Sequence, residues 1–232
     1  MKKAVVVLSG GVDSTTLLYH LLAQGYEINT ALSFNYGQKH AKELDYAVST
    51  VRFINSKLQP NIVHKIIKVP FNELTYKSSL TGDVAVPEGH YENESMKLTV
   101  IPSRNLIFIS IASALAITEQ SKLAVGIHAG DHTIYPDTRE EFIKAAESAI
   151  KIGNWDSENF EILAPFVDIS KADIIKWGIG AAKYLGISLF DMYYRTWSCY
   201  KGGEKACGKC GTCVERLEAF EKNGIKDPIE YE

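Results

Sequence analysis

The stretch that most constrains the fold covers residues 8–18 and reads L-S-G-G-V-D-S-T-T-L-L. A short, β-branched apolar run at residues 4–8 leads into it, and leucines at helical spacing follow from Ser14. This pattern predicts a buried strand, a tight glycine turn and a helix start capped by Asp13 or Ser14. Backbone N–H groups of such a helix start face whatever lies in the loop. The stretch therefore predicts a phosphate-binding loop.

Side chains of this loop can add to a phosphate site. Ser9 and Ser14 supply hydroxyl donors, and the Asp13 carboxylate is placed to hold a magnesium ion rather than a phosphate. The patterns G-x-G-x-x-G and G-x-x-x-x-G-K-[ST] are both absent here, which excludes two common phosphate loops at this position. The alternative is a turn whose glycines serve packing alone.

Size and charge exclude several classes of protein. The chain has 232 residues and a net charge of −3, so it can bury a substantial core but has no overall positive field for nucleic acid. The first apolar run stops at Ser9, too short for a signal peptide, and no stretch approaches transmembrane length. We therefore expect a cytoplasmic protein with no direct nucleic-acid partner and no membrane partner.

All four cysteines lie close together near the C-terminus, with the spacing C-x7-C-x2-C-x2-C. They are Cys199, Cys207, Cys210 and Cys213. In a reducing compartment such a cluster indicates a metal site rather than disulfides. Four thiolates complete the tetrahedral shell of one structural zinc ion, at Zn–S distances of about 2.3 Å. An iron–sulfur cluster is the alternative, because a sequence fixes the sulfur ligands better than the metal.

The rest of the chain alternates apolar strand and helix patterns, which predicts an open α/β sheet. Further strands are predicted at residues 28–34, 62–69, 123–127 and 160–167, and helices at 40–58, 106–119, 142–152, 171–185 and 213–221. We expect a single domain over residues 1–232. A polar insertion at about 71–100 is expected to act as a lid or an oligomer contact, and residues 196–221 to form a zinc-binding appendage.

Polar residues follow several of these predicted strands or begin the helices after them. Phe34 and Asn35 would frame adenine at the carboxyl end of the second strand, the alternative being a simple turn. Arg104, at a helix start, is placed to meet an anionic ligand, with a solvated surface cation as the alternative. Lys171 begins a helix capped by Ser170 and can reach a phosphate, or else is solvated.

A second polar concentration lies at residues 128–139, after the fourth predicted strand. Its histidines, aspartates, tyrosine and arginine suit the recognition of a polar heterocycle or acid–base work. In particular, Asp137 can accept paired N–H groups of a guanine-like edge. The alternative is turn chemistry around Pro136, with His128 as a packed core histidine.

Five motifs in order resemble the 7-cyano-7-deazaguanine synthase family of the N-type ATP pyrophosphatases, over nearly the whole chain. They are S-G-G-V-D-S-T-T (9–16), N-Y-G-Q-K-H (35–40), I-P-S-R-N (101–105), Y-P-D-T-R (135–139) and T-W-S-C-Y-K-G (196–202), continued by C-G-K-C-G-T-C (207–213). The resemblance implies a Rossmann-like, open parallel sheet of the adenine nucleotide alpha hydrolase type, with a C-terminal zinc knuckle.

The resemblance also implies an ATP-dependent ligase that forms a carbon–nitrogen bond. In that family 7-carboxy-7-deazaguanine, ammonia and ATP give 7-cyano-7-deazaguanine, a precursor of queuosine and archaeosine. The acid is adenylated and aminated to the amide, and the amide is then adenylated and eliminated to the nitrile. Thr138 departs from the pattern, because many relatives are expected to carry cysteine there. With every cysteine in the zinc cluster, a covalent thioester route is closed.

Together, the motifs and the resemblance predict four groups of site residues. The catalytic residues are Asp13, Ser14, Arg104 and Lys171. ATP is expected to contact Leu8, Ser9, Gly10, Gly11, Val12, Asp13, Ser14, Thr15, Thr16, Leu17, Leu18, Phe34 and Asn35. The substrate is expected to contact Tyr36, Gln38, Asn105, Asp131, Tyr135, Asp137 and Arg139. The cofactors are zinc on the four cysteines and Mg²⁺ with ATP.

Other functions stay open at this point. The donor is expected to be free ammonia, because no glutaminase segment is visible, and a homodimer is compatible with the sequence. A relative in the same superfamily could act on another acceptor, by thiolation of transfer RNA or by transfer of a deazaguanine to an amine. A non-catalytic module that binds nucleotide and zinc is the third alternative.

Overall fold

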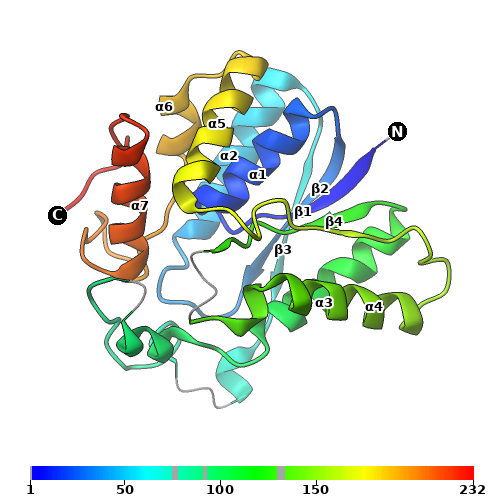
Figure 1. The fold of residues 1–232 in the computed structure, drawn as a ribbon, viewed down its shortest axis with the longest axis horizontal. Helices are drawn as coiled ribbons and strands as arrows, with labels where there is room; N and C mark the ends of the chain where they lie inside the picture. Colours follow the sequence, from blue (N-terminus) through cyan, green and yellow to red (C-terminus); the bar gives the residue numbers. More distant parts are fainter. Residues whose placement is uncertain (1, 75–77, 91–92, 130–133) are drawn as a thin grey trace.

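A computed structural model describes residues 2–74, 78–90, 93–129 and 134–232. Within these ranges a five-stranded parallel sheet has the order β3-β2-β1-β4-β5 (Figure 1). The strands are β1 (Lys3–Val7), β2 (Glu27–Asn35), β3 (Val63–Lys68), β4 (Lys122–Ala124) and β5 (Ile162–Leu163). The predicted open parallel sheet is confirmed. Its strand order reverses beside β1, which is where ligands bind in such sheets.

Helices cover both faces of this sheet (Figure 1). One face carries α1 (Val12–Ala23), α2 (Glu43–Leu58) and α5 (Lys171–Leu185), and α6 (Leu189–Tyr194) and α7 (Gly211–Lys222) pack on α5. The other face carries α3 (Arg104–Thr118) and α4 (Glu140–Gly153). Short 3-10 helices are η1 (Phe71–Leu74), η2 (Glu94–Thr99) and η4 (Pro136–Thr138). Among the described helices, none combines the length and apolar character needed to cross a bilayer.

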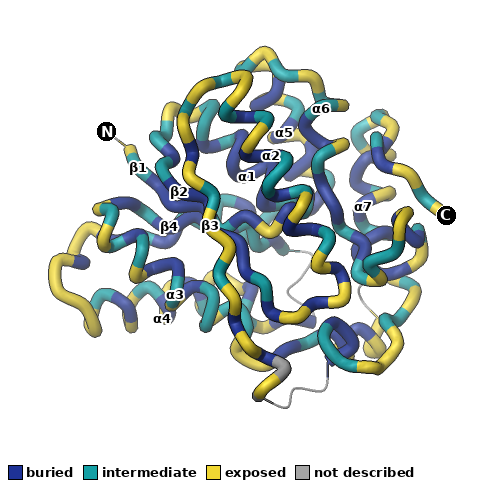
Figure 2. Tube along the Cα trace, turned by 180° about the vertical axis from the view of Figure 1, so that it is seen from behind, coloured by how far each residue is buried: buried dark blue, intermediate teal, exposed yellow. Residues whose placement is uncertain are grey.

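Two apolar cores lie on the two faces because successive strand side chains point in opposite directions. Ala4 and Val6 of β1 join the core under α1, α2 and α5, whereas Val5 joins the core under α3 and α4. Figure 2 shows buried segments through the middle of the molecule, while the edge strand β3 is mostly exposed. The central position of β1 therefore places the turn that follows it between the two layers of helices.

Two local predictions are wrong. Helix α1 begins at Val12, and its N-cap is Gly11 without a side-chain hydrogen bond, so neither Asp13 nor Ser14 caps it. The leucine spacing marks only the later turns of this helix. The strand predicted at residues 160–167 is reduced to β5, because Pro165 has no N–H group for a ladder and a turn follows it. The predicted cap of α5 is confirmed, since Ser170 Oγ accepts from Asp173 N at 3.2 Å.

The described part of the polar insertion connects two motifs that are distant in sequence. The Lys39 N–H, in the turn after β2, donates to the Leu80 carbonyl at 2.8 Å. Further along, the Gly89 N–H donates to the Lys209 carbonyl at 2.9 Å, inside the cysteine-rich segment. Residues 78–90 therefore pack between the turn after β2 and the cysteines. Whether this segment acts as a lid stays a prediction.

Gly10 is the point where the turn after β1 lies against α2. Its φ is +94°, and a Cβ atom there would lie 2.1 Å from the carbonyl oxygen of Glu43. The Gly10 carbonyl also accepts a hydrogen bond from Trp197 N at 2.8 Å. Only glycine fits this position without moving α2.

We expect Gly10→Ala to lower the free energy of unfolding by about 3 kcal/mol or more, through positive-φ strain and overpacking. Gly25→Ala is the matched control, because Gly25 also has a positive φ, of +75°, but a Cβ atom there would meet nothing within 4 Å. It should lose only about 1 kcal/mol. Urea unfolding of both variants measures the difference, and equal losses would contradict the contact with α2.

Candidate functional site

A cavity of about 230 Å³ opens at the carboxyl ends of β1, β2 and β4. The turn after β1, the starts of α3 and α5, and residues 197–200 contribute to its walls. The predicted site residues that line it are Leu8, Ser9, Gly11, Asp13, Ser14, Phe34, Tyr36, Arg104, Asn105, Tyr135 and Lys171. The fold thus brings candidate ATP, substrate and catalytic residues from five distant segments to one place.

Other predicted site residues are not among the lining residues. These are Gly10, Val12, Thr15, Thr16, Leu17, Leu18, Asn35, Gln38, Asp137 and Arg139. Leu17 and Leu18 are fully buried in the core, and the Thr16 hydroxyl pairs with the Tyr193 hydroxyl at 3.1 Å. Arg139 is the N-cap residue of α4 and lies 3.9 Å from the Glu141 carboxylate. Asp131 lies outside the described residues.

The turn after β1 is held in shape by its two serines. Ser14 Oγ accepts from Ser9 N at 3.1 Å, and Ser9 Oγ accepts from Gly11 N at 3.2 Å. The first helical hydrogen bond of α1 runs from Thr15 N to the Gly11 carbonyl at 3.1 Å. A helix start of this kind leaves the N–H groups of residues 12–14 without an intrahelical acceptor. These groups and the positive end of the helix dipole give the cavity wall the features of a candidate anion-binding site.

A charged cluster lies beside this helix start. Lys171 Nζ is 2.6 Å from Glu215 Oε2 and 3.4 Å from Asp13 Oδ2. His128 Nε2 lies 3.8 Å from Asp13 Oδ2 and 3.9 Å from Glu215 Oε1. Glu215 was not predicted, because it comes from α7, a helix distant in sequence from Asp13 and Lys171. Nothing in its local sequence pattern indicates a contact with Lys171.

A second buried group faces the cavity from the start of α2. Glu43 Oε1 accepts from Gln38 Nε2 at 3.0 Å and lies 3.5 Å from His40 Nε2. Burial raises the pKa of Glu43 to about 8, although the Gln38 hydrogen bond and Arg104 act to lower it. Burial and then the charge of Arg104 lower the pKa of His40 to about 3. Both side chains are therefore largely uncharged at neutral pH.

Neither Glu43 nor His40 was among the predicted site residues. In sequence, Glu43 looks like an ordinary acidic residue in a first helical turn. Gln38, predicted to contact substrate, is instead buried and hydrogen-bonded to the backbone of its own turn, at Tyr36 N and the Phe34 carbonyl. Ser198 and Tyr200, which also line the cavity, lie within the motif T-W-S-C-Y-K-G, so that motif could have indicated them.

Arg104 provides the positive charge at this end of the cavity. Its guanidinium lies 6.0 Å from the centre of the Tyr36 ring and 5.7 Å from that of Tyr135. Burial acts to lower the pKa of Arg104, but Tyr36, Tyr135, Tyr200 and Asp137 together raise it above its usual value. The arginine is therefore always charged. Asp137 acts on it electrostatically although it is not a lining residue.

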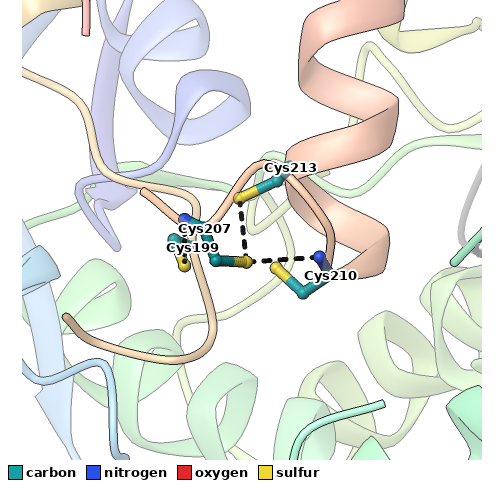
Figure 3. Close-up of side chains that lie close together, drawn as sticks. All are labelled: Cys199, Cys207, Cys210 and Cys213. Atoms are coloured by element: carbon teal, nitrogen blue, oxygen red, sulfur yellow. Dashed lines mark hydrogen bonds between the residues drawn. The ribbon is translucent and has the colours of Figure 1, made fainter. Parts of the chain in front are cut away.

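The four cysteines form a compact, buried group (Figure 3). One ligand atom from each lies within 4.8 Å of those of the others. Backbone N–H groups point at two sulfurs: Cys210 N donates to Cys207 Sγ at 3.3 Å and Cys207 N to Cys199 Sγ at 3.4 Å. Contacts with the Cys199 and Cys213 sulfurs lower the pKa of Cys210. The same sulfur contacts raise the pKa of Cys199 and of Cys213. The closeness of the four sulfurs confirms the predicted grouping of the cysteines as a candidate metal site.

The raised pKa of Glu43 predicts a pH dependence of stability. Between pH 4.5, its usual pKa, and about pH 8, Glu43 keeps a proton in the folded protein that it loses in the unfolded chain. Stability therefore falls as the pH rises through this range. The lowered pKa of His40 makes stability rise with pH, but only between about pH 3 and pH 6.5. From pH 6.5 to 8 we therefore expect the protein to lose roughly 2 kcal/mol of unfolding free energy through Glu43.

Glu43→Gln should remove this loss, because glutamine has no proton to release. The exposed Glu141→Gln is the control and should keep the slope of the unmodified protein. Denaturant unfolding at several pH values between 6.5 and 8 measures the effect. The same slope in the Glu43→Gln variant would contradict the burial effect on this carboxyl group.

Comparisons with known proteins identify the family. The family described as "Queuosine biosynthesis protein QueC" matches residues 3–224. A 7-cyano-7-deazaguanine synthase of Caldicellulosiruptor saccharolyticus is 52% identical over 99% of this chain and 96% of its own length, and one of Pseudoalteromonas atlantica is 48% identical over 100% of both. The U34-tRNA thiolase NcsA of Methanococcus maripaludis is 20% identical in sequence, with a TM-score of 0.42 over 96% of this chain and 67% of its own. The chain belongs to the QueC family of queuosine biosynthesis proteins.

Proposed function

We propose that this chain converts 7-carboxy-7-deazaguanine, ammonia and ATP into 7-cyano-7-deazaguanine. Its relatives carry the name of that synthase over their full lengths. One observation of the structure carries the proposal: the helix-start amides of α1, with Asp13 and Lys171, open onto the same cavity as Arg104 and Tyr135. A nucleoside triphosphate and a second, anionic heterocyclic molecule can therefore bind side by side in this cavity.

ATP is proposed to place its phosphates at the start of α1. The N–H groups of residues 12–14 would bind phosphate oxygens, and Lys171 would offset their charge. Asp13 fits the role of a magnesium ligand, because its Oδ1 is buried without a hydrogen-bond partner among the described residues. Bound Mg²⁺ would offset part of the negative charge of the phosphates. Phe34 stacks in parallel on Phe108 at 4.2 Å, which offers an apolar wall for adenine.

The acid substrate is proposed to lie at the opposite end, near Arg104. A guanidinium held between two tyrosines can orient the substrate carboxylate for attack on the α-phosphorus of ATP. The attack breaks the bond to pyrophosphate, which stays on the α1 amides as the leaving group. Ammonia then displaces AMP and gives the amide, with loss of one proton. A second ATP then adenylates the amide oxygen with release of a second pyrophosphate and one proton, and elimination of AMP with the remaining N–H proton leaves the nitrile.

Free ammonia is the proposed nitrogen donor. Hydrolysis of glutamine by a cysteine nucleophile would need a thiol outside the metal cluster, and all four cysteines of this chain lie within it. Thr138, whose hydroxyl donates to the Tyr135 carbonyl at 2.7 Å, lines the cavity where relatives are expected to carry cysteine. Activation is therefore assigned to ATP alone. Assembly into a homodimer stays a prediction.

Zinc is the metal that we propose for the cysteine cluster. Tetrahedral Zn–S bonds of about 2.3 Å place two sulfurs about 3.8 Å apart. Cys207 Sγ and Cys213 Sγ are separated by 3.9 Å, which fits one ion. A four-iron cluster lies between its cysteines and holds their sulfurs further apart, so the spacing supports zinc over the alternative. Bound zinc would stabilise the fold of residues 199–213.

The proposed reaction predicts a defined set of products. Incubation with the acid, ammonium, ATP and Mg²⁺ should give the nitrile, AMP and pyrophosphate, detected by mass spectrometry. Asp13→Asn should lower kcat/KM by about a hundredfold or more, because the site loses the carboxylate charge that would hold Mg²⁺ beside the phosphates. Asp45→Asn, at an exposed position of α2, is the control and should keep full activity. Absence of AMP release with the unmodified protein would contradict the proposal.

The zinc assignment predicts about one zinc ion per chain in the purified protein by elemental analysis. Cys210→Ser should lose that zinc and several kcal/mol of stability, because binding of the metal contributes to folding. Iron in place of zinc, with visible absorption that Cys210→Ser abolishes, would instead favour an iron–sulfur cluster.

A further inference from the structure

The contacts of Lys171 differ sharply between its two carboxylate neighbours. Its Nζ atom is 2.6 Å from Glu215 Oε2, which is a charge-assisted hydrogen bond, and 3.4 Å from Asp13 Oδ2, which is beyond normal hydrogen-bond distance. The side chains of Lys171 and Glu215 are only 7% and 15% exposed. Solvent therefore screens the two attractions weakly, and of these two carboxylates Glu215 holds the lysine more closely.

Asp13 also keeps an unused acceptor, on the carboxylate oxygen that Lys171 does not approach. Its Oδ1 is buried and has no hydrogen-bond partner among the described residues. Asp13 is the other carboxylate that the described residues place beside the ammonium group, so a Glu215 side chain without charge would leave the attraction of Asp13 uncontested by Glu215. In a weakly screened site the lysine would then move onto Asp13 and compete with any cation for the same oxygens.

Glu215 is fixed from outside the cavity. Two residues before it, Cys213 belongs to the cysteine cluster, and the next residue, Arg216, is fully buried and donates to Asp227 at 2.6 Å. At the far end of α7, Asn223 Nδ2 donates to the Ala172 carbonyl of α5 at 2.8 Å. These contacts set the position of α7 relative to α5, and hence the position of Glu215 relative to Lys171.

We propose that Glu215 is a positioning residue that holds Lys171 away from Asp13 and so keeps the Asp13 carboxylate open for a divalent cation. The inference rests on the proposed function, because it assumes that ATP binds with a cation at the start of α1. By this inference, α7 and the cysteine cluster affect the affinity of the cavity for a cation as well as the stability of the fold, because they fix the position of Glu215.

The test measures binding rather than turnover. The probe is α,β-methylene ATP, which cannot be cleaved at the relevant bond, titrated calorimetrically into the protein at increasing Mg²⁺ concentrations. Glu215→Gln should need about tenfold more Mg²⁺ for half-maximal binding, and high Mg²⁺ should restore it. Glu218→Gln is the control on the same helix, since the Glu218 side chain is 40% exposed and pairs with His90 at 3.2 Å. Its Mg²⁺ dependence should not change.

A double variant separates this role from a merely structural one. Lys171→Met combined with Glu215→Gln removes the competing ammonium group, so its half-maximal Mg²⁺ concentration should return to that of the unmodified protein, even if its nucleotide affinity is lower. It also removes the buried lysine whose ion pair with Glu215 the single variant loses, so it covers the case in which the single variant fails to fold. Metal content and thermal unfolding of all variants are measured in parallel.

Each outcome decides something. An unchanged Mg²⁺ dependence in Glu215→Gln overturns the inference, and so does a loss of binding that neither Mg²⁺ nor the double variant corrects. If the unmodified protein binds no nucleotide analogue at any Mg²⁺ concentration, the proposed function fails first and the inference with it. Restoration in the double variant supports both.

Discussion

The contact between Gly10 and the start of α2 fixes the turn after β1 against that helix, and this turn forms one wall of the cavity. Because no side chain fits at residue 10, the turn after β1 can lie directly against the Glu43 carbonyl, and its own carbonyl accepts from Trp197. Three segments from different parts of the chain are thereby held around one residue. The start of α1, the start of α2 and the segment before the cysteines reach the cavity together. A looser turn would separate the anion site from the groups opposite it.

The two ends of the cavity have different electrostatic character. Near α1, Asp13, Lys171 and Glu215 form a charged cluster, with His128 beside it, that suits phosphates and a cation. Toward α3, Arg104 faces tyrosines and a carboxyl group that burial keeps protonated. Such a division matches a reaction in which one molecule supplies a leaving diphosphate and another supplies a carboxylate. The described residues thus arrange charge for two ligands rather than for one.

Sequence reasoning was most successful where a function depends on a short continuous segment. Local patterns mark the glycine turn with Asp13, the four cysteines, and Arg104 and Lys171 at helix starts. The structure brings these residues to the cavity or to the cysteine cluster. Glu43 and Glu215 have no such pattern. Their roles arise because α2 and α7 pack beside elements far away in sequence. The length of the last predicted strand, at residues 160–167, was overestimated for a similar reason. An apolar run alone does not show where the pairing of a strand with its neighbour ends.

The protonated state of Glu43 affects the enthalpy that is measured when a ligand binds in this cavity. A ligand that presents N–H donors to this side chain favours the carboxylate, so its arrival expels a hydrogen ion into the surrounding solution. The apparent affinity of such a ligand then increases as the pH rises toward the pKa of Glu43. The enthalpy recorded on its association also includes the ionisation heat of whichever buffer takes up that hydrogen ion.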